Sequence, residues 1–180
     1  MVNLNIGSWL TLMCLLVCAT AVRADDQSTQ VSEGAEFSVY SSEVGENLVL
    51  AGELDLQALR AAHDGGILVV DLRTEKEGAP EEAAAAQALG LAYTNIPVSS
   101  AEIDASQVSA LQQALDGASA DDLVVVHCRS GNRAGLLWGA TQLEAGVPIG
   151  EVHERVSGIV TMEPISQGLE AYAKRLDAGQ

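Results

Sequence analysis

The stretch Val124-Val-Val-His-Cys-Arg-Ser-Gly-Asn-Arg-Ala-Gly135 joins a predicted strand to a predicted helix. The three valines before His127 indicate the end of a buried strand. From Ala134 onward leucine and alanine recur at helical spacing, so a helix is expected after a short loop. A strand that leads through a tight loop into a helix can form an anion site. The first N–H groups of the helix have no partners within it, and the helix dipole favours negative charge there.

Cys128 and Arg133 are the candidate catalytic residues of this loop. The field at the helix start favours a thiolate over a thiol, which makes Cys128 a candidate nucleophile. The planar guanidinium of Arg133 can hold an oxyanion through two hydrogen bonds. An arginine in the first helical turn is unfavourable beside the dipole unless an anion is present. We therefore predict a cysteine-dependent site for an oxyanion, and a buried, inert cysteine is the alternative.

The residues around these two side chains form the predicted oxyanion-binding loop. Gly131 allows the backbone to approach a ligand closely. Ser130 and Asn132 are expected to contribute backbone N–H groups, not side-chain chemistry. Arg129 either adds positive potential or points to solvent. The predicted loop is Arg129, Ser130, Gly131, Asn132 and Ala134.

Strand and helix patterns alternate along the rest of the chain. Strands are predicted at 36–40, 47–51, 66–71, 92–97 and 124–127. Helices are predicted at 55–63, 81–89, 104–115, from 134 onward, and at about 149–156 and 164–176. This pattern predicts a three-layer α/β domain with a central, mostly parallel sheet of about four or five strands flanked by helices. Ligands of such sheets bind beyond the carboxyl ends of the strands, where the Cys128 loop and the loop beginning at Arg73 are both expected.

The net charge and the first residues of the chain indicate which partners the protein can bind and which compartment it occupies. The net charge is −16, which argues against nucleic acid as a partner. Residues 1–24 contain an apolar run of signal-peptide length, too short for a comfortable membrane span, with an uncleaved anchor as the alternative. We expect a secreted or periplasmic protein with a flexible segment at 25–35, an α/β domain at 36–178 and no membrane span after cleavage. Cleavage would remove Cys14 and Cys18, leaving Cys128 as the only thiol.

The segment His127-Cys-Arg-Ser-Gly-Asn-Arg133 resembles two enzyme families. Cysteine-dependent phosphatases of the tyrosine and dual-specificity type carry His-Cys, five residues and then Arg. Rhodanese-type sulfurtransferases carry a shorter loop, often Cys-Arg-x-Gly-x-Arg. Four residues separate Cys128 from Arg133, so the length of the loop resembles rhodanese.

The rest of the chain resembles the phosphatases. The similar stretches begin at Leu48-Val-Leu-Ala-Gly-Glu-Leu, Val69-Val-Asp-Leu-Arg and Leu91-Ala-Tyr-Thr-Asn-Ile-Pro. They are closest to the phosphatase-like domain found with beta-lactamase-hydrolase-like proteins, and the resemblance covers about residues 35–175. It implies a phosphatase-like fold and a phosphomonoester hydrolase that works through a phosphocysteine.

The resemblance also implies roles for His127 and for a general acid, and the expected place of Arg73 at the same sheet edge favours a supporting role for it. His127 would orient the loop and favour the thiolate of Cys128. A phosphatase needs a general acid, and Asp104 is the candidate, although Asp104-Ala-Ser-Gln107 also has the spacing of a helix cap. Arg73 would support the site, with surface ion pairing as the alternative.

Two other functions remain open at the level of sequence. A sulfurtransferase would form a persulfide on Cys128 from a donor such as thiosulfate, while Arg133 holds the oxyanion of the donor. The third hypothesis is a non-enzymatic oxyanion-binding domain with an inert Cys128. The expected partner is a small oxyanion or a phosphorylated substrate. No cofactor and no metal site are predicted, because His63 and His153 lack ligand spacing, and the sequence does not indicate the oligomeric state.

Overall fold

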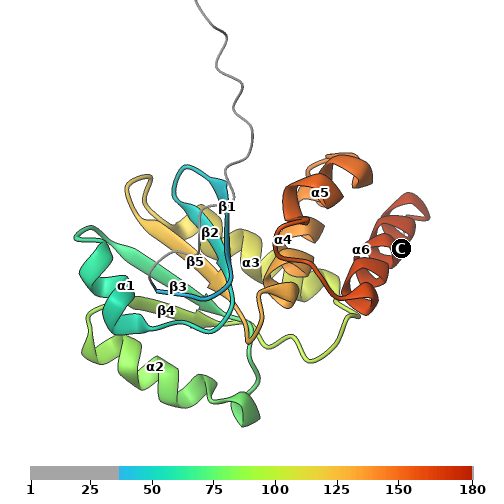
Figure 1. The fold of residues 1–180 in the computed structure, drawn as a ribbon. Helices are drawn as coiled ribbons and strands as arrows, with labels where there is room; N and C mark the ends of the chain where they lie inside the picture. Colours follow the sequence, from blue (N-terminus) through green and yellow to red (C-terminus); the bar gives the residue numbers. More distant parts are fainter. Residues whose placement is uncertain (1–36, 180) are drawn as a thin grey trace, which may run out of the picture. The chain divides into compact units, whose positions relative to one another are not determined.

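The computed structural model describes residues 37–179, which are built around one five-stranded sheet (Figure 1). The order of the strands is β1-β2-β5-β3-β4. Strand β1 is antiparallel to β2, and the other neighbours are parallel. The strands are β1 (Ser41–Gly45), β2 (Leu48–Ala51), β3 (Ile67–Asp71), β4 (Ala92–Asn95) and β5 (Leu123–His127). The predicted α/β fold with a mostly parallel sheet is confirmed.

Helices cover both faces of this sheet (Figure 1). One face carries α1 (Leu56–Ala62) and α2 (Ala79–Ala88). The other face carries α3 (Ala105–Gly117), α4 (Asn132–Glu144), α5 (Ile149–Val156) and α6 (Glu163–Asp177). A short 3-10 helix, η1 (Glu75–Glu77), lies between β3 and α2.

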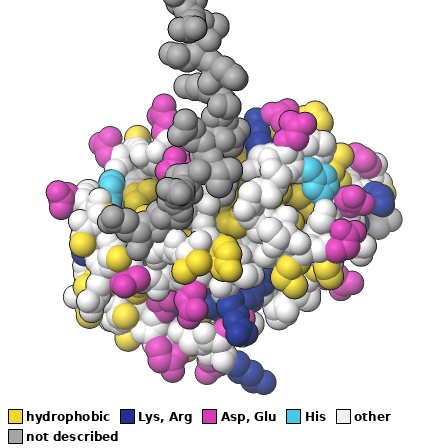
Figure 2. Space-filling view, viewed as in Figure 1, with side chains coloured by type: hydrophobic (Ala, Val, Ile, Leu, Met, Phe, Trp, Pro, Cys, Tyr) yellow, Lys and Arg dark blue, Asp and Glu magenta, His cyan; other side chains and the backbone are white. Residues whose placement is uncertain are grey.

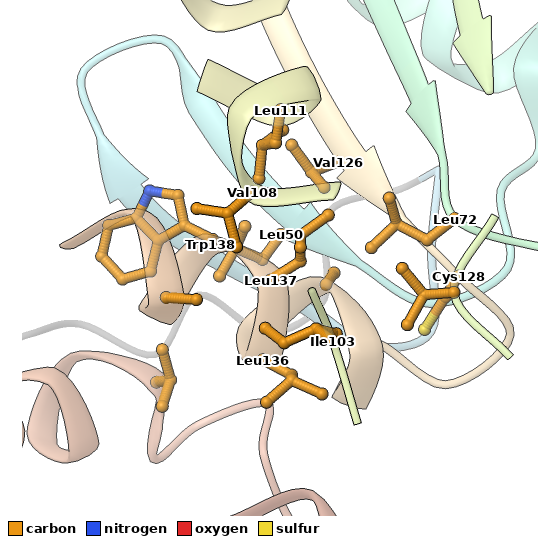
Figure 3. Close-up of a cluster of buried hydrophobic side chains, with 14 of the residues drawn as sticks. Leu50, Leu72, Ile103, Val108, Leu111, Val126, Cys128, Leu136, Leu137 and Trp138 are labelled. Carbon is orange, nitrogen blue, oxygen red and sulfur yellow. The ribbon is translucent and has the colours of Figure 1, made fainter. Parts of the chain in front are cut away.

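The central position of β5 follows from its composition. Its valines are buried on both faces, as expected of a strand between two helical layers. Val124 and Val126 belong to the larger core beneath α3 to α6, and Val125 belongs to the smaller core beneath α1 and α2. Part of the larger core is shown in Figure 3, with Cys128 at one end of the cluster in that view. The carboxyl end of β5 therefore lies where the two cores approach the loop that begins at Cys128.

Several predicted boundaries differ from the structure. The first strand comprises Ser41–Gly45, whereas residues 37–40 of the predicted strand form none, because Ser41–Gly45 pairs with β2 at the edge of the sheet although it lacks an apolar pattern. Helices α2 and α4 each begin two residues earlier than predicted, because Gly78 and Gly131 precede them as caps. The predicted signal sequence (1–24), the predicted flexible segment (25–35) and residue 36 lie outside the described residues. Among residues 37–179, no helix has the length and apolar character to cross a membrane.

Candidate active site

The loop after β5 is closed tightly around Cys128. The residue is completely buried, and its N–H donates to the carbonyl of Ala51 at the end of β2, at 3.2 Å. Gly131 has φ 81° at the start of α4, a conformation that glycine adopts readily. A Cβ at Gly131 would lie 2.3 Å from Cγ1 of Ile159. Glycine is therefore required both by the turn and by the segment that packs on it.

The backbone after Gly131 offers donors for an anion. The first hydrogen bond of α4 runs from the N–H of Gly135 to the carbonyl of Gly131, at 3.0 Å. The preceding N–H groups therefore lack intrahelical partners, as at any helix start. They belong to Asn132, Arg133 and Ala134. This arrangement agrees with an anion site at the start of α4.

The side chain of Asn132 has a role that the sequence did not indicate. Its Oδ1 accepts hydrogen bonds from the N–H groups of Thr161 and Met162, at 2.8 and 2.9 Å. Its amide nitrogen donates to Oγ of Ser130 at 3.3 Å. Ser130 in turn forms a bridge with Gly52, whereas Arg129 is exposed. Asn132 thus ties the loop to the segment before α6 through its side chain, a structural role beside the backbone role predicted for it.

Arg133 is held beside Cys128 by a carboxylate on η1. Its Nη1 and Nη2 donate to Oε2 and Oε1 of Glu77, at 2.9 and 2.7 Å. Nη1 also donates to the carbonyl of Val98, at 2.7 Å. The hydrogen bond to Glu77 raises the pKa of Arg133, and the charge of Cys128 and a hydrogen bond to its side chain add to this effect. The guanidinium is therefore fixed and permanently charged within reach of the thiol.

Glu77 is the main residue of the candidate site that was not predicted from the sequence. The hydrogen bond from Arg133 lowers the pKa of Glu77 to about 2, so this carboxylate stays ionised. Thr74 and Glu77 form a capping box. That spacing in Thr74-Glu75-Lys76-Glu77 was the available signal for a helical turn. That this turn faces Arg133 could not be predicted, because Glu77 and Arg133 are 56 positions apart in the sequence.

His127 and Cys128 project toward opposite faces of the sheet, as neighbours on a strand do. Cys128 belongs to the core beneath α3 to α6. His127 is completely buried, and its Nε2 lies 2.7 Å from Oε1 of Glu82 on α2, which packs on the other face. Arg73 lies in the same cluster. It is buried against Asp71 and Glu82, so it forms a buried ion pair and not the surface ion pair that was the alternative to a supporting role.

Asp104 lies at the exposed start of α3, where it forms a capping box with Gln107. Its Oδ1 accepts hydrogen bonds from Oγ of Ser106 and from the N–H of Gln107, at 2.5 and 3.0 Å. The bond from Ser106, followed by that from Gln107, lowers the pKa of Asp104. The predicted cap is present, and the hydrogen bonds that form it engage the carboxylate of Asp104.

A cavity of about 620 Å³ opens beside Arg133. It is lined by Thr74, Glu75, Lys76, Glu77, Ser99 and Arg133. Although the chain carries a net charge of −16, the side of the molecule seen in Figure 2 gathers Lys and Arg near the carboxyl ends of the strands. Arg129 and Lys76 are exposed cations, and Lys76 also lines the cavity. The lining of the cavity itself combines two carboxylates, Glu75 and Glu77, with two cations, Lys76 and Arg133.

One group of side chains could offer ligands to a metal ion, although the sequence predicted none. Asp71, Glu82 and His127 each place one donor atom within 4.8 Å of the others. Arg73 already contacts both carboxylates of this group. The two carboxylates are thus already partnered by a cation that belongs to the chain.

Residues 42–145 match the family described as "Beta-lactamase hydrolase-like protein, phosphatase-like domain". A curated relative with 31% identity over 110 residues is the Beta-lactamase hydrolase-like protein of Xylella fastidiosa strain Temecula1. That match covers 58% of this chain and 25% of the relative. The chain thus corresponds to about a quarter of the length of this longer protein. The predicted resemblance to this group is confirmed.

Solved structures similar to the chain share the phosphatase-like fold. A DUF442 protein from Shewanella putrefaciens CN-32, described as a candidate phosphatase, has a TM-score of 0.63 and 22% identity, over 79% of this chain and 91% of that one. P. aeruginosa TpbA, in a complex with pTyr, has a TM-score of 0.58 and 19% identity, over 74% and 82% of the two chains. The PP-IP phosphatase Siw14 of S. cerevisiae has a TM-score of 0.58 and 16% identity, over 81% and 95%. At these identities the likeness concerns the fold alone.

Proposed function

Because the chain belongs to the family of beta-lactamase hydrolase-like protein phosphatase-like domains, we propose that it is a cysteine-dependent hydrolase of phosphomonoesters. The observation that carries the proposal is the position of Arg133. Glu77 fixes both terminal nitrogens of this arginine, and Cys128 interacts with it. A preorganised cation beside a nucleophile stabilises the charge that develops on a transferring phosphoryl group.

The reaction proceeds in two displacements at phosphorus. The thiolate of Cys128 attacks phosphorus, the bond to the ester oxygen breaks, and a phosphocysteine forms. A water molecule then attacks phosphorus, the P–S bond breaks, and phosphate and the thiolate are released. Arg133 and the N–H groups at the start of α4 bind the phosphoryl oxygens in both steps.

The surroundings of the site favour substrates with a good leaving group. Asp104 is engaged in the cap of α3, and Glu77 is engaged with Arg133. An aryl phosphate releases a stabilised phenolate, which depends less on protonation by an acid than an alkoxide does. TpbA, a structural relative, was crystallised with pTyr, so an aryl phosphate is the first substrate class to test.

Sulfur transfer is a second candidate function, favoured by the engagement of Asp104 and by the four-residue spacing between Cys128 and Arg133. The thiolate of Cys128 attacks the outer sulfur of thiosulfate, the S–S bond breaks, and sulfite leaves with its electron pair. Cyanide or a thiolate then takes the outer sulfur from the persulfide and restores the Cys128 thiolate. Neither step needs a general acid.

Parallel assays on one preparation separate the two reactions. Hydrolysis of para-nitrophenyl phosphate and sulfur transfer from thiosulfate to cyanide are measured for the purified protein and for Cys128→Ser. We expect phosphate release that is lost in Cys128→Ser. Phosphate release that survives the substitution would rule out the first function. Thiocyanate formation at background would rule out the second.

We also propose that the protein is exported. The apolar run within residues 1–24 supports this proposal. Protein recovered from an extracytoplasmic fraction should have an intact mass that corresponds to a chain from which roughly residues 1–24 are missing. A full-length mass in that fraction would argue for an uncleaved anchor, and recovery only from the cytoplasm would contradict export.

A further inference from the structure

The segment between β4 and α3 (residues 96–104) forms one side of the site. The carbonyl of Val98 accepts a hydrogen bond from Nη1 of Arg133 at 2.7 Å, and Ser99 lines the cavity. The N–H of Val98 donates to the carbonyl of Leu72, just beyond β3, at 3.0 Å. The next residues, 99–103, belong neither to a strand nor to a helix. Their backbone therefore depends on other elements for its position.

Helix α6 contacts the backbone of this segment at two points (Figure 1). At the first point, a Cβ on Gly168 would lie 2.3 Å from the carbonyl oxygen of Ala101. At the second point, Nη2 of Arg175 donates to the carbonyl of Ile103 at 2.8 Å. Positions 168 and 175 are about two turns apart, so both lie on one face of α6. Only glycine lets the helix lie this close to Ala101.

Arg175 is itself held in place by contacts within α6 and with α4. Its guanidinium lies over the ring of Tyr172, 5.1 Å from the ring centroid. Tyr172 is buried, and its hydroxyl donates to Oε1 of Glu144 at 2.5 Å. Glu144 ends α4, and Arg133 lies in the first turn of the same helix. Residues 98–103 are thus bound at one end to the start of α4 and at the other end to a side chain that is anchored on the end of α4.

Packing of the core alone does not account for these contacts. Ile165 and Leu169 give α6 its place in the larger core, whereas Gly168 has no side chain to bury and Arg175 donates to a main-chain acceptor. The family match ends at residue 145, so α6 lies beyond the part of the chain that it describes. What Gly168 and Arg175 have in common is the segment that they hold, and that segment reaches the candidate catalytic arginine.

We propose that Gly168 and Arg175 are positioning residues for Arg133, acting through residues 98–103. They fix the far end of this segment, so that its first carbonyl keeps its place beside Nη1 of the arginine. A displaced carbonyl would turn the guanidinium away from the phosphoryl oxygens, and a misplacement of about 1 Å can lower a rate about 100-fold. The proposal rests on the role of Arg133 in the proposed function, but not on the identity of the substrate.

The first experiment compares two glycine substitutions in helices. Gly168→Ala places a methyl group against Ala101 and should move the segment, whereas a Cβ at Gly150 in α5 would meet nothing within 4 Å in the described part of the chain. Gly150→Ala is therefore the matched control. Hydrolysis of para-nitrophenyl phosphate gives kcat and KM, and calorimetric titration with inorganic phosphate gives a Kd that needs no turnover. In Gly168→Ala we expect kcat to fall about tenfold and the Kd for phosphate to rise about fivefold, while Gly150→Ala changes neither.

A second set of variants separates positioning from a general effect on the fold. Arg175→Ala should also lower kcat, and Arg175→Lys, which keeps a donor for the carbonyl of Ile103, should restore part of the rate. Lys174→Ala is the control, because 79% of the Lys174 side chain is exposed. In an Arg133→Ala background, Gly168→Ala should change kcat/KM by less than about twofold, because residues that act through one another are not additive. Circular dichroism checks that each variant is folded at the assay temperature.

The outcomes distinguish this proposal from the proposed function. Equal kcat and equal Kd for phosphate in the wild type and Gly168→Ala would overturn the positioning role, and so would an undiminished effect of Gly168→Ala in the Arg133→Ala background. The Arg175 variants carry the test if Gly168→Ala does not fold. A wild type that binds phosphate without hydrolysing the ester would contradict the proposed function, while the Kd values still decide on positioning. A wild type that does neither would overturn both.

Discussion

Two arginines at the carboxyl edge of the sheet bind carboxylates in different settings. Arg73 is enclosed by Asp71 and Glu82, and 8% of its side chain is exposed. Arg133 pairs with Glu77, a carboxylate whose side chain is 30% exposed and lines the cavity beside the loop. The first pair lies within the protein and the second lies at its surface, although both guanidinium groups form bidentate contacts.

The difference shows how the same side chain serves structure in one place and binding in another. Arg73 forms its hydrogen bonds with groups inside the fold, so its charge is neutralised within the protein. Arg133 donates three N–H groups to Glu77 and Val98, and a guanidinium has five. Arg133 can therefore be oriented by Glu77 and still bind an oxyanion.

The largest effect is expected from breaking the enclosed pair. Asp71→Ala leaves Arg73 buried with one carboxylate fewer, and the loss of one partner of a buried ion pair costs about 3 to 5 kcal/mol. Urea denaturation should show this loss in the free energy of unfolding. The control is Glu77→Ala. Because the ion pair of Glu77 with Arg133 is more exposed, its loss should lower the free energy of unfolding by only about 1 kcal/mol. Equal losses in the two variants would remove the distinction between the arginines.

The second effect concerns activity. Arg133→Ala should lower kcat/KM by about 100- to 1000-fold, as expected when a preorganised donor to a developing charge is removed. The measurement uses whichever of the two assays is positive in the wild type. Arg129→Ala, a change at an exposed arginine of the same loop, should lower it by less than about tenfold, since a solvated charge contributes mainly to the field. A similar loss in both variants would mean that general positive charge, and not the fixed geometry of Arg133, supports the reaction.

A third, smaller effect depends on pH. The pKa of Glu77 is lowered to about 2 in the folded protein, against about 4.3 for an unperturbed glutamate. A lowered pKa stabilises the fold above the unfolded value, and this contribution is lost as the pH falls toward the folded value. The difference in unfolding free energy between the wild type and Glu77→Gln should therefore be constant above about pH 5 and shrink between about pH 4 and 2. A difference that does not vary with pH would show that the Glu77 carboxylate is not held by Arg133 in solution.

The smallest effect is expected at Asp104, which should contribute to stability and not to activity. Asp104→Ala removes the cap of α3 and should cost about 1 kcal/mol of unfolding free energy, while kcat/KM changes less than about twofold. Asp104→Asn keeps a capping oxygen and should retain most of the stability. A fall of about 100-fold in kcat/KM in both variants would instead assign Asp104 as the general acid of the reaction.

The sequence predicted the features that depend on neighbours along the chain. The valines of β5, the loop from Cys128 and the start of α4 follow one another directly, and local rules describe them. Asp55 and Asp104 are found as caps because a cap acts within three residues. The edge strand β1 was misplaced because its sequence, SSEVG, has little apolar pattern, and its place depends on pairing with β2.

The features that were missed depend on residues far apart in sequence. Glu77 reaches Arg133 across 56 positions, and Tyr93 reaches Asp71 across 22. Arg73 looked like a surface residue because its own segment is charged, yet α2 brings Glu82 over it. The composition of one segment cannot show which carboxylates the fold will bring to an arginine, so the identity of the loop was predictable and its supporting partners were not.

The contact of Ile159 with Gly131 has a consequence for how such loops diverge during evolution. Ile159 fills the space above Gly131, and Asn132 is bonded to the backbone of Thr161 and Met162. An added fifth residue between Cys128 and Arg133 would have to displace this covering segment and the two helices that it connects. Loop length and the carboxyl-terminal helices should therefore be inherited together, and grafting a longer loop alone should yield a protein that no longer folds cooperatively.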